Sequence, residues 1–252
     1  GRANRLSARW ADEIFVQFEE SKNHFPCTRA VMRTVGCPLR SRFLHPDPKK
    51  AKAELGLDSS KHILLVTGAS SGSTRINEAV CRLLPRLEAF ADRWQVVHLA
   101  GLDNYQAVFE EYRGTRLSHK VLDYYDGMAD LLAAGDLVIG RSGAVSVAEY
   151  AVAGVPSICL PYPFHKDKHQ YLNAGKLAEV GAAVIVDDVS DTDDRAGRLW
   201  RELEPLMCDE ARRRRMAQAC GRVAKPDAAS QIASRLLEMA DKSLSVAMND
   251  GP

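Results

Sequence analysis

The residues best suited to bind an anionic ligand lie in residues 136–149, where a short apolar run is followed by Ser142, Gly143 and Ala144. Small residues leave a turn with little side-chain bulk, so a ligand can approach the backbone closely. If this turn opens a helix, its N–H groups and the positive end of its dipole suit a diphosphate. Glu149 would lie about two turns into that helix, where its carboxylate could accept hydrogen bonds from two neighbouring sugar hydroxyls.

The same stretch has a purely structural interpretation. Ser146 and Glu149 fit the capping-box pattern S-x-x-E, in which the glutamate only bonds to the start of its own helix. Turns of small residues between a strand and a helix also occur in α/β domains that bind nothing. The local pattern alone favours neither interpretation.

Residues 68–74 form a second loop of small residues that follows an expected strand and opens an expected helix. The carboxyl ends of parallel strands lie at one edge of a sheet, where open α/β sheets bind ligands. Ser70 could donate its hydroxyl to a phosphate oxygen, or it could cap the helix. The loop matches neither G-x-G-x-x-G nor a Walker A motif.

Residues 161–174 are a third segment that leads from a strand into a helix. Gln170 and Asn173 share a helical face, and their amides can both donate to and accept from sugar hydroxyls. Three residues with side chains that can bind metals alternate before the helix: His165, Asp167 and His169. Because the segment enters a helix, these three should not converge, and we expect no metal site.

Strands that alternate with helices predict an α/β fold with a parallel, doubly wound, Rossmann-like sheet. The six expected strands are residues 62–67, 95–100, 119–124, 137–139, 156–161 and 181–186. From about residue 194 the chain reads as a helical tail, broken at Pro226. The arginines of residues 212–215 are expected to form a solvated face of that tail.

The pattern changes before residue 62. We divide the chain into residues 1–45, with short strands at 12–18 and 31–35; a linker, residues 46–61; a ligand-binding domain, residues 62–225; and a final helix and tail, residues 226–252. Arg40 ends a Gly-Cys-Pro-Leu-Arg turn, which would fix where its side chain points.

The composition excludes some classes of function. The 252 residues carry 34 Lys and Arg against 33 Asp and Glu, so the net charge of +1 attracts neither nucleic acid nor an anionic membrane at long range. The six cysteines form no C-x-x-C pair and read as reduced thiols of a cytosolic protein. The sequence contains no signal peptide and no apolar run near the roughly 18 residues that span a bilayer.

These segments, in this order, resemble the motifs of the MurG family. The five corresponding family patterns are G-N-P-V-R for residues 36–40, V-x-G-G-S-Q-G-A for 66–73, R-[AS]-G-A-x-T-x-x-E for 141–149, D-x-H-Q-x-x-N-A with its trailing G-A-A for 167–174 and 181–183, and P-D-A for 226–228. One such motif would be weak, but five in register identify the chain as similar to this family over nearly its whole length.

The resemblance implies a GT-B fold, in which two Rossmann-like domains face each other across a cleft. It implies an inverting glycosyltransferase of peptidoglycan synthesis that moves GlcNAc from UDP-GlcNAc to undecaprenyl-diphosphate-MurNAc-pentapeptide. Such an enzyme needs no metal or other cofactor and acts at the cytoplasmic face of the bacterial membrane as a peripheral protein. Most of the N-terminal acceptor domain, with its general base, would be missing, so no catalytic residue is expected in this chain.

The resemblance also implies roles for individual residues in donor binding. Glu149 would bind the ribose hydroxyls, and Arg40 and Ser70 would contact the diphosphate. Gln170, with Asn173 nearby, would bind the GlcNAc hydroxyls. The start of the helix at Gly143, Ala144, Val145 and Ser146 would face the diphosphate, and the segment around Tyr125 would meet the uracil.

Three other functions remain open at this point. One is a diacylglycerol glycosyltransferase of the same fold. Another is the donor subunit of a two-chain GlcNAc transferase. The last is a module that binds UDP-sugars without turnover.

Overall fold

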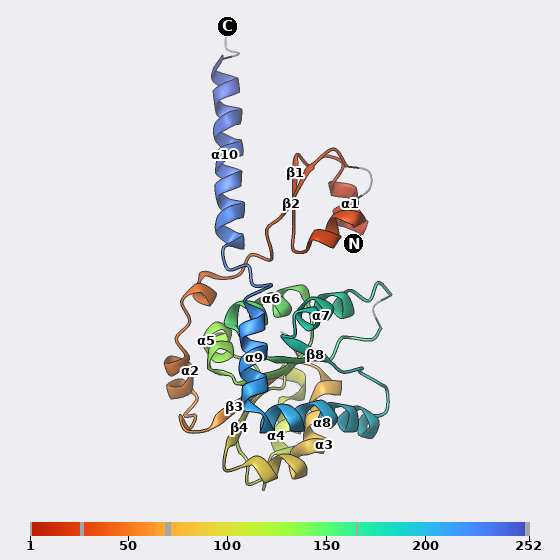
Figure 1. Cartoon of the computed structure of the whole chain (residues 1–252), viewed down its shortest axis with the longest axis vertical. Helices are drawn as coiled ribbons and strands as arrows, with labels where there is room; N and C mark the ends of the chain where they lie inside the picture. The colour runs from red at the N-terminus through yellow and green to blue at the C-terminus, as the bar shows by residue number, and fades with distance from the viewer. Residues whose placement is uncertain (1, 26–27, 69–71, 165, 250–252) are drawn as a thin grey trace. The chain divides into compact units, whose positions relative to one another are not determined.

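The computed structural model describes residues 2–25, 28–68, 72–164 and 166–249 (Figure 1). The chain divides into two compact units. Residues Gly1–Arg40 and Lys225–Pro252 form unit 1, and residues Ser41–Ala224 form unit 2. The candidate site lies in unit 2, which is described first.

Unit 2 is built on a six-stranded parallel sheet with the strand order β5-β4-β3-β6-β7-β8. Its strands are β3 (His62–Thr67), β4 (Trp94–Leu99), β5 (Ser118–Leu122), β6 (Leu137–Gly140), β7 (Ser157–Cys159) and β8 (Ala183–Ile185). The predicted doubly wound α/β sheet is confirmed, with each expected strand within three residues of its observed ends.

Helices cover both faces of this sheet (Figure 1). They are α2 (Pro48–Glu54), α3 (Thr74–Leu87), α4 (Tyr105–Glu111), α5 (Met128–Ala134), α6 (Ala144–Ala153), α7 (His169–Glu179), α8 (Thr192–Cys208) and α9 (Glu210–Cys220). Contacts join α2, α5, α6 and α7 into one layer, and α3, α4 and α8 into the other. Short 3₁₀ turns occur at Ser41–Leu44, Glu88–Phe90 and Leu102–Asn104.

The central strands β3 and β6 determine where a ligand can bind. They pair in parallel with Thr67 opposite Gly140, so their carboxyl ends lie side by side. The chain leaves β3 through α3 toward β4, and it leaves β6 through α6 toward β7 on the other side. The two connections therefore diverge at this edge of the sheet, which is where open α/β sheets bind ligands.

The core of unit 2 is apolar on both faces of the central strands. Residues 63–66 of β3 and 137–139 of β6 are fully buried, which matches their unbroken apolar sequence. Each fully buried aliphatic side chain contributes about 1.5–3 kcal/mol relative to an exposed one. Burial of this kind makes the strand ends rigid supports for the loops that follow them.

The expected linker is an ordered part of unit 2. Asp130 on α5 is buried, and its carboxylate accepts hydrogen bonds from Arg42 Nε at 2.9 Å and from the Asp47 N–H at 2.7 Å. The hydrogen bond from Arg42 is the main cause of the lowered pKa of Asp130. Helix α2 packs against α5 in the same layer.

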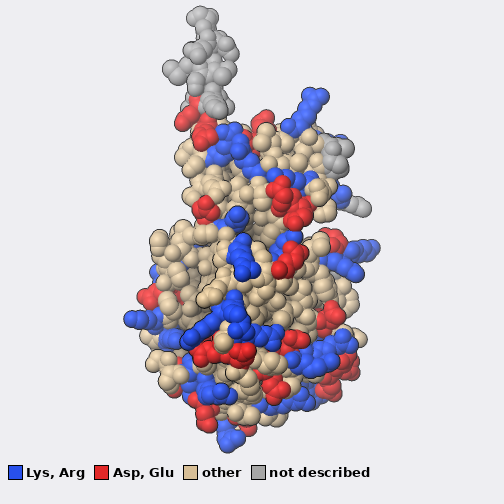
Figure 2. All heavy atoms as spheres, viewed as in Figure 1, with Lys and Arg blue, Asp and Glu red and all other residues tan. Residues whose placement is uncertain are grey.

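The arginine run of α9 is not a uniformly solvated face, which corrects that expectation for Arg213. This side chain is buried, donates to the Leu206 carbonyl at 2.7 Å at the end of α8, and lies 4.7 Å from the centre of the Trp94 ring. Its neighbour Arg214 is exposed and pairs with Glu210. On the face drawn in Figure 2, Lys and Arg side chains are interspersed with Asp and Glu.

Unit 1 contains α1 (Arg2–Ser7), β1 (Glu13–Val16), a 3₁₀ turn (Glu19–His24), β2 (Val31–Thr34) and α10 (Ala228–Asn249). The strands β1 and β2 pair in parallel. Glu13 accepts hydrogen bonds from Arg235 on α10 and Arg33 on β2, which together lower its pKa to about 2. In the described part of the chain, no helix is both long and apolar enough to cross a bilayer.

A chain of buried hydrogen bonds lies between β4 and its flanking helices. Asn77 Nδ2 donates to the Ala100 carbonyl at 2.9 Å, and its Oδ1 lies 3.0 Å from His98 Nε2. Tyr112 Oη lies 3.1 Å from His98 Nδ1. All of these hydrogen bonds can form when the His98 imidazole is neutral, because its Nε2–H then donates to Asn77 and its Nδ1 accepts from Tyr112. Burial lowers the pKa of His98 from 6.5 to about 3.

This burial predicts a pH dependence of stability. The folded-state pKa of His98 is depressed, so only the unfolded chain binds a proton there between about pH 6.5 and pH 3. The contribution of His98 to the free energy of unfolding is therefore fully present above pH 6.5 and is lost as the pH falls toward 3. The free energy of unfolding should fall by roughly 2–3 kcal/mol from this group between pH 7 and pH 4.5. Urea unfolding of wild type and His98→Gln at both pH values isolates the effect. An equal decrease in the free energy of unfolding of the two proteins would contradict this role of His98.

Gly140 predicts a second stability effect. A Cβ at this position would meet Tyr150 Oη at 2.3 Å and Thr67 Cγ2 at 3.1 Å, and the tyrosine is itself buried and bonded to the Arg141 carbonyl. Gly140→Ala should therefore cost about 1–3 kcal/mol of stability.

The matched control is Gly197→Ala in α8, where no described atom lies within 4 Å of an added Cβ. This change should stabilise the protein by up to about 1 kcal/mol, since alanine favours a helix. Thermal unfolding of both variants tests the contrast, and a Gly140→Ala protein as stable as wild type would refute the packing argument.

Candidate functional site

The turn between β6 and α6 is the centre of the candidate site. Gly140 ends the strand, Arg141 and Ser142 are buried, and Gly143 is the N-cap of α6 with φ −59° and no side-chain cap. The helix begins at Ala144, so Ser146 is its third residue and cannot be the N-cap residue of a capping box. The structural alternative for Ser146 and Glu149 is therefore wrong.

The start of α6 is open to an approaching molecule. Of the described atoms, only Ser146 Oγ, at 3.7 Å, would come within 4 Å of a Cβ added to Gly143. Ala144 is exposed, and so is Val145, with 51% of its surface accessible. The first-turn N–H groups of a helix have no acceptor inside the helix, and its dipole makes this end positive.

The start of α7 is joined directly to this turn. Ser142 Oγ donates to the Gln170 carbonyl at 2.9 Å, and Asn173 Nδ2 donates to the Ser142 carbonyl at 3.1 Å. Two residues predicted from sequence to act together, Gln170 and Asn173, therefore lie beside the α6 turn. The amide of the buried Asn173 serves to hold the two helix starts together.

Gln170 is half-buried and is held in place on one side. Its Oε1 accepts from the Tyr162 N–H at 2.9 Å, which ties it to the loop after β7. With Oε1 engaged, its Nε2 is the group suited to donate to a hydroxyl of a ligand.

Glu149 is half-buried on α6. It lies three and four residues after Ser146 and Val145, so the three share one helical face. Val147 and Tyr150, which point to the other side of the helix, are buried in the core. Glu149 therefore belongs to the same exposed side of α6 as the helix start.

The second small-residue loop contributes one described contact to the site. Ser70 lies outside the described residues. The N-cap of α3 is Ser73, whose Oγ accepts from the Ile76 N–H at 3.4 Å and from Arg141 Nη2 at 2.8 Å. The start of α3 is thus tied to the residue that precedes the α6 turn.

Two further predicted residues belong to other segments of the chain. Tyr125 follows β5, and its hydroxyl donates to Glu54 Oε2 on α2 at 2.8 Å. Burial and this carboxylate raise the pKa of Tyr125 to about 12. Arg40 is exposed at the end of unit 1, so its place in the donor site stays a prediction.

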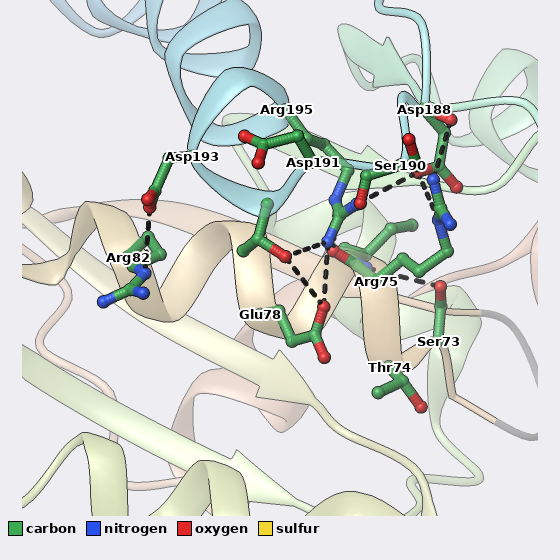
Figure 3. Close-up of polar contacts among 12 residues, drawn as sticks. Ser73, Thr74, Arg75, Glu78, Arg82, Asp188, Ser190, Asp191, Asp193 and Arg195 are labelled. Carbon is green, nitrogen blue, oxygen red and sulfur yellow. Dashed lines mark hydrogen bonds and ion pairs between the residues drawn. The ribbon is translucent and has the colours of Figure 1, made fainter.

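Sequence reasoning missed a cluster of arginines around Asp188, which follows β8. Arg75 Nε and Arg141 Nη1 each lie 2.7 Å from its carboxylate, and Arg195 Nη1 lies 3.7 Å away. Figure 3 shows Arg75 and Arg195 converging on the segment around Asp188 and Ser190. The only sequence signal was two acids, Asp187 and Asp188, directly after an expected strand.

The described residues contain no group of three or more His, Cys, Asp or Glu side chains placed to hold a metal ion. His165 lies outside these residues, and Asp167 Oδ1 lies 2.7 Å from His169 Nδ1. The side chains gathered at the α6 and α7 starts are hydroxyl, amide and carboxylate groups, which together suit a hydroxyl-rich anionic ligand.

Curated proteins match most of the chain. It is 34% identical over 233 residues to the "UDP-N-acetylglucosamine--N-acetylmuramyl-(pentapeptide) pyrophosphoryl-undecaprenol N-acetylglucosamine transferase" of Halothermothrix orenii, covering 90% of this chain and 62% of that protein. It is also 34% identical over 247 residues to the protein of the same name from Desulfitobacterium hafniense, covering 96% and 66%. The chain thus spans 62% to 66% of these relatives.

A solved structure supports the same relationship. MurG of Acinetobacter baumannii superposes with a TM-score of 0.69 at 27% identity, over 94% of this chain and 64% of that one. Residues 63–232 match the family described as "Glycosyltransferase family 28 C-terminal domain". The resemblance to MurG read from the five motifs is confirmed, and the chain belongs to the glycosyltransferase family 28 C-terminal domain family.

Proposed function

We propose that this chain is the donor-binding part of an inverting glycosyltransferase. The enzyme would transfer GlcNAc from UDP-GlcNAc to undecaprenyl-diphosphate-MurNAc-pentapeptide in peptidoglycan synthesis, as a peripheral protein at the cytoplasmic face of the membrane. The relatives carry this activity in their names, and they are longer than this chain. The proposal therefore leaves the acceptor and the general base to the family's N-terminal domain.

The observation that carries the proposal is the joining of two helix starts at one edge of the sheet. The starts of α6 and α7 are held together through Ser142, Gln170 and Asn173. The proposed surface would combine the positive end of α6, the carboxylate of Glu149 and the Nε2 end of the Gln170 carboxamide. A diphosphate, a ribose and a hexosamine need these three kinds of group.

The proposed chemistry follows from charge. As the acceptor hydroxyl attacks the anomeric carbon, the bond from that carbon to the UDP oxygen breaks and negative charge grows on the leaving diphosphate. The start of α6 stabilises this charge with its N–H groups and dipole, and Arg40 is the proposed side-chain partner. Glu149 and Gln170 hold the ribose and the sugar so that the departing bond faces the acceptor.

Donor preference tests the proposed function. Calorimetric titration of the 252-residue chain with UDP-GlcNAc, UDP-glucose and UDP-galactose should give the tightest binding for UDP-GlcNAc. A preference for UDP-glucose or UDP-galactose would instead favour a glycolipid glucosyl- or galactosyltransferase. Absence of binding by all three would reject the donor site. With the N-terminal part of a relative joined to the chain, binding without transfer to the lipid acceptor would favour a UDP-sugar-binding module.

Glu149 provides a test of one residue. Glu149→Ala should weaken UDP binding by about 1.5–3 kcal/mol, or roughly 10- to 150-fold, the range for a hydrogen bond to a charged group. The matched control is Glu179→Ala at the exposed end of α7, where the carboxylate pairs with Lys176. Calorimetry with UDP that gives the same affinity for Glu149→Ala and for the control would remove Glu149 from the site.

A further inference from the structure

One buried guanidinium, that of Arg141, connects the loops around the proposed donor site. Its side chain is 8% exposed. Nη1 donates to the Leu160 carbonyl at 2.8 Å, just after β7, and Nη2 donates to Ser73 Oγ at 2.8 Å, at the start of α3. The guanidinium also lies 5.6 Å from the centre of the Tyr162 ring in the loop before α7. The same residue directly precedes the α6 turn.

The carboxylate of Asp188 completes these connections. It is fully buried, and its two oxygens accept from different arginines, Oδ2 from Arg141 and Oδ1 from Arg75. Arg75 belongs to the first turn of α3 and also donates to the Asp188 and Val189 carbonyls. The loop after β8 is thereby held against the loops after β3, β6 and β7.

The third arginine, Arg195 on α8, bonds to the backbone of the same cluster. It donates to the Arg75 and Val189 carbonyls at 2.9 Å and 2.7 Å and to Glu78 Oε2 at 2.8 Å (Figure 3). Burial lowers its pKa, although Asp188 and Glu78 oppose that effect. Buried ion pairs of this kind contribute little net stability, because desolvation offsets their attraction. What they provide is a defined geometry.

We propose that Arg141 and Asp188 are positioning residues of the donor site. They fix the starts of α3 and α6 and the loop before α7 in the arrangement that receives the diphosphate. This inference rests on the proposed function, since it concerns the same site. The planar guanidinium is required because it donates in several fixed directions at once, whereas a lysine ammonium is a compact point charge.

A purely electrostatic role and a positioning role predict opposite effects of Asp188→Asn on UDP affinity. If the cluster acted only through its charge, Asp188→Asn would remove a negative charge near a bound anion and should tighten UDP binding. If it acts by positioning, the same change frees Arg141 and Arg75 from their shared acceptor and should weaken binding. A merely stabilising role would lower the melting temperature and leave the UDP affinity of the folded protein unchanged.

The experiment measures UDP affinity by calorimetry, well below the melting temperature, for three variants of the 252-residue chain. Asp188→Asn and Arg141→Lys should each weaken UDP binding about tenfold. Arg141→Lys conserves the charge and loses only the fork of donors. The control is Asp187→Asn, whose carboxylate is exposed and accepts from Tyr171 Oη at 3.1 Å, and it should bind UDP as wild type does.

Unchanged or tighter UDP binding by both Asp188→Asn and Arg141→Lys would overturn the positioning role. If Asp188→Asn does not fold, the result for Arg141→Lys alone decides, with a melting curve to establish that this variant is folded. Failure of wild type to bind UDP would reject the proposed function itself. Wild-type binding with unaffected variants would reject only the positioning role, so the two failures are distinguishable.

Discussion

The arrangement of unit 2 depends on the parallel pairing of β3 with β6. Because their connections leave in opposite directions, the carboxyl ends of these two strands are not covered by a crossover between them. The core residues of the two strands lie behind this edge, and the exposed residues Ala144 and Val145 at the start of α6 lie in front of it. The proposed donor site and the arginine cluster both involve residues that follow β3 and β6.

Much of this architecture could be predicted from sequence, because each element depends on local patterns. The unbroken apolar runs of β3 and β6 can only be buried, and Gly154 marks the end of α6 with a left-handed φ of 69°. Gln170 and Asn173 could be paired because a helix places residues three apart on one face. The family resemblance then supplied what spacing could not, namely the class of ligand.

The remaining features depend on contacts between segments far apart in the chain. Arg75, Arg141 and Arg195 meet Asp188 across as many as 113 residues, and their local sequence gives no sign of a common partner. From sequence, Arg213 cannot be distinguished from the three arginines beside it. It differs from them because it contacts carbonyls at the end of α8 and the ring of Trp94. The start of α6 also lies three residues before the position that the capping-box alternative requires, because the N-cap residue is Gly143 and not Ser146, and this changes the role open to Glu149.

The contact between Gly140 and Tyr150 has a consequence for how this sequence can vary. The tyrosine hydroxyl occupies the space in which any side chain at position 140 would begin, and it also bonds to the Arg141 carbonyl at 3.1 Å. A side chain at position 140 therefore fits without strain only beside a smaller residue at position 150, and that pair of changes would leave the Arg141 carbonyl without this donor. A homologue with a side chain at position 140 is therefore expected to carry a smaller residue at position 150.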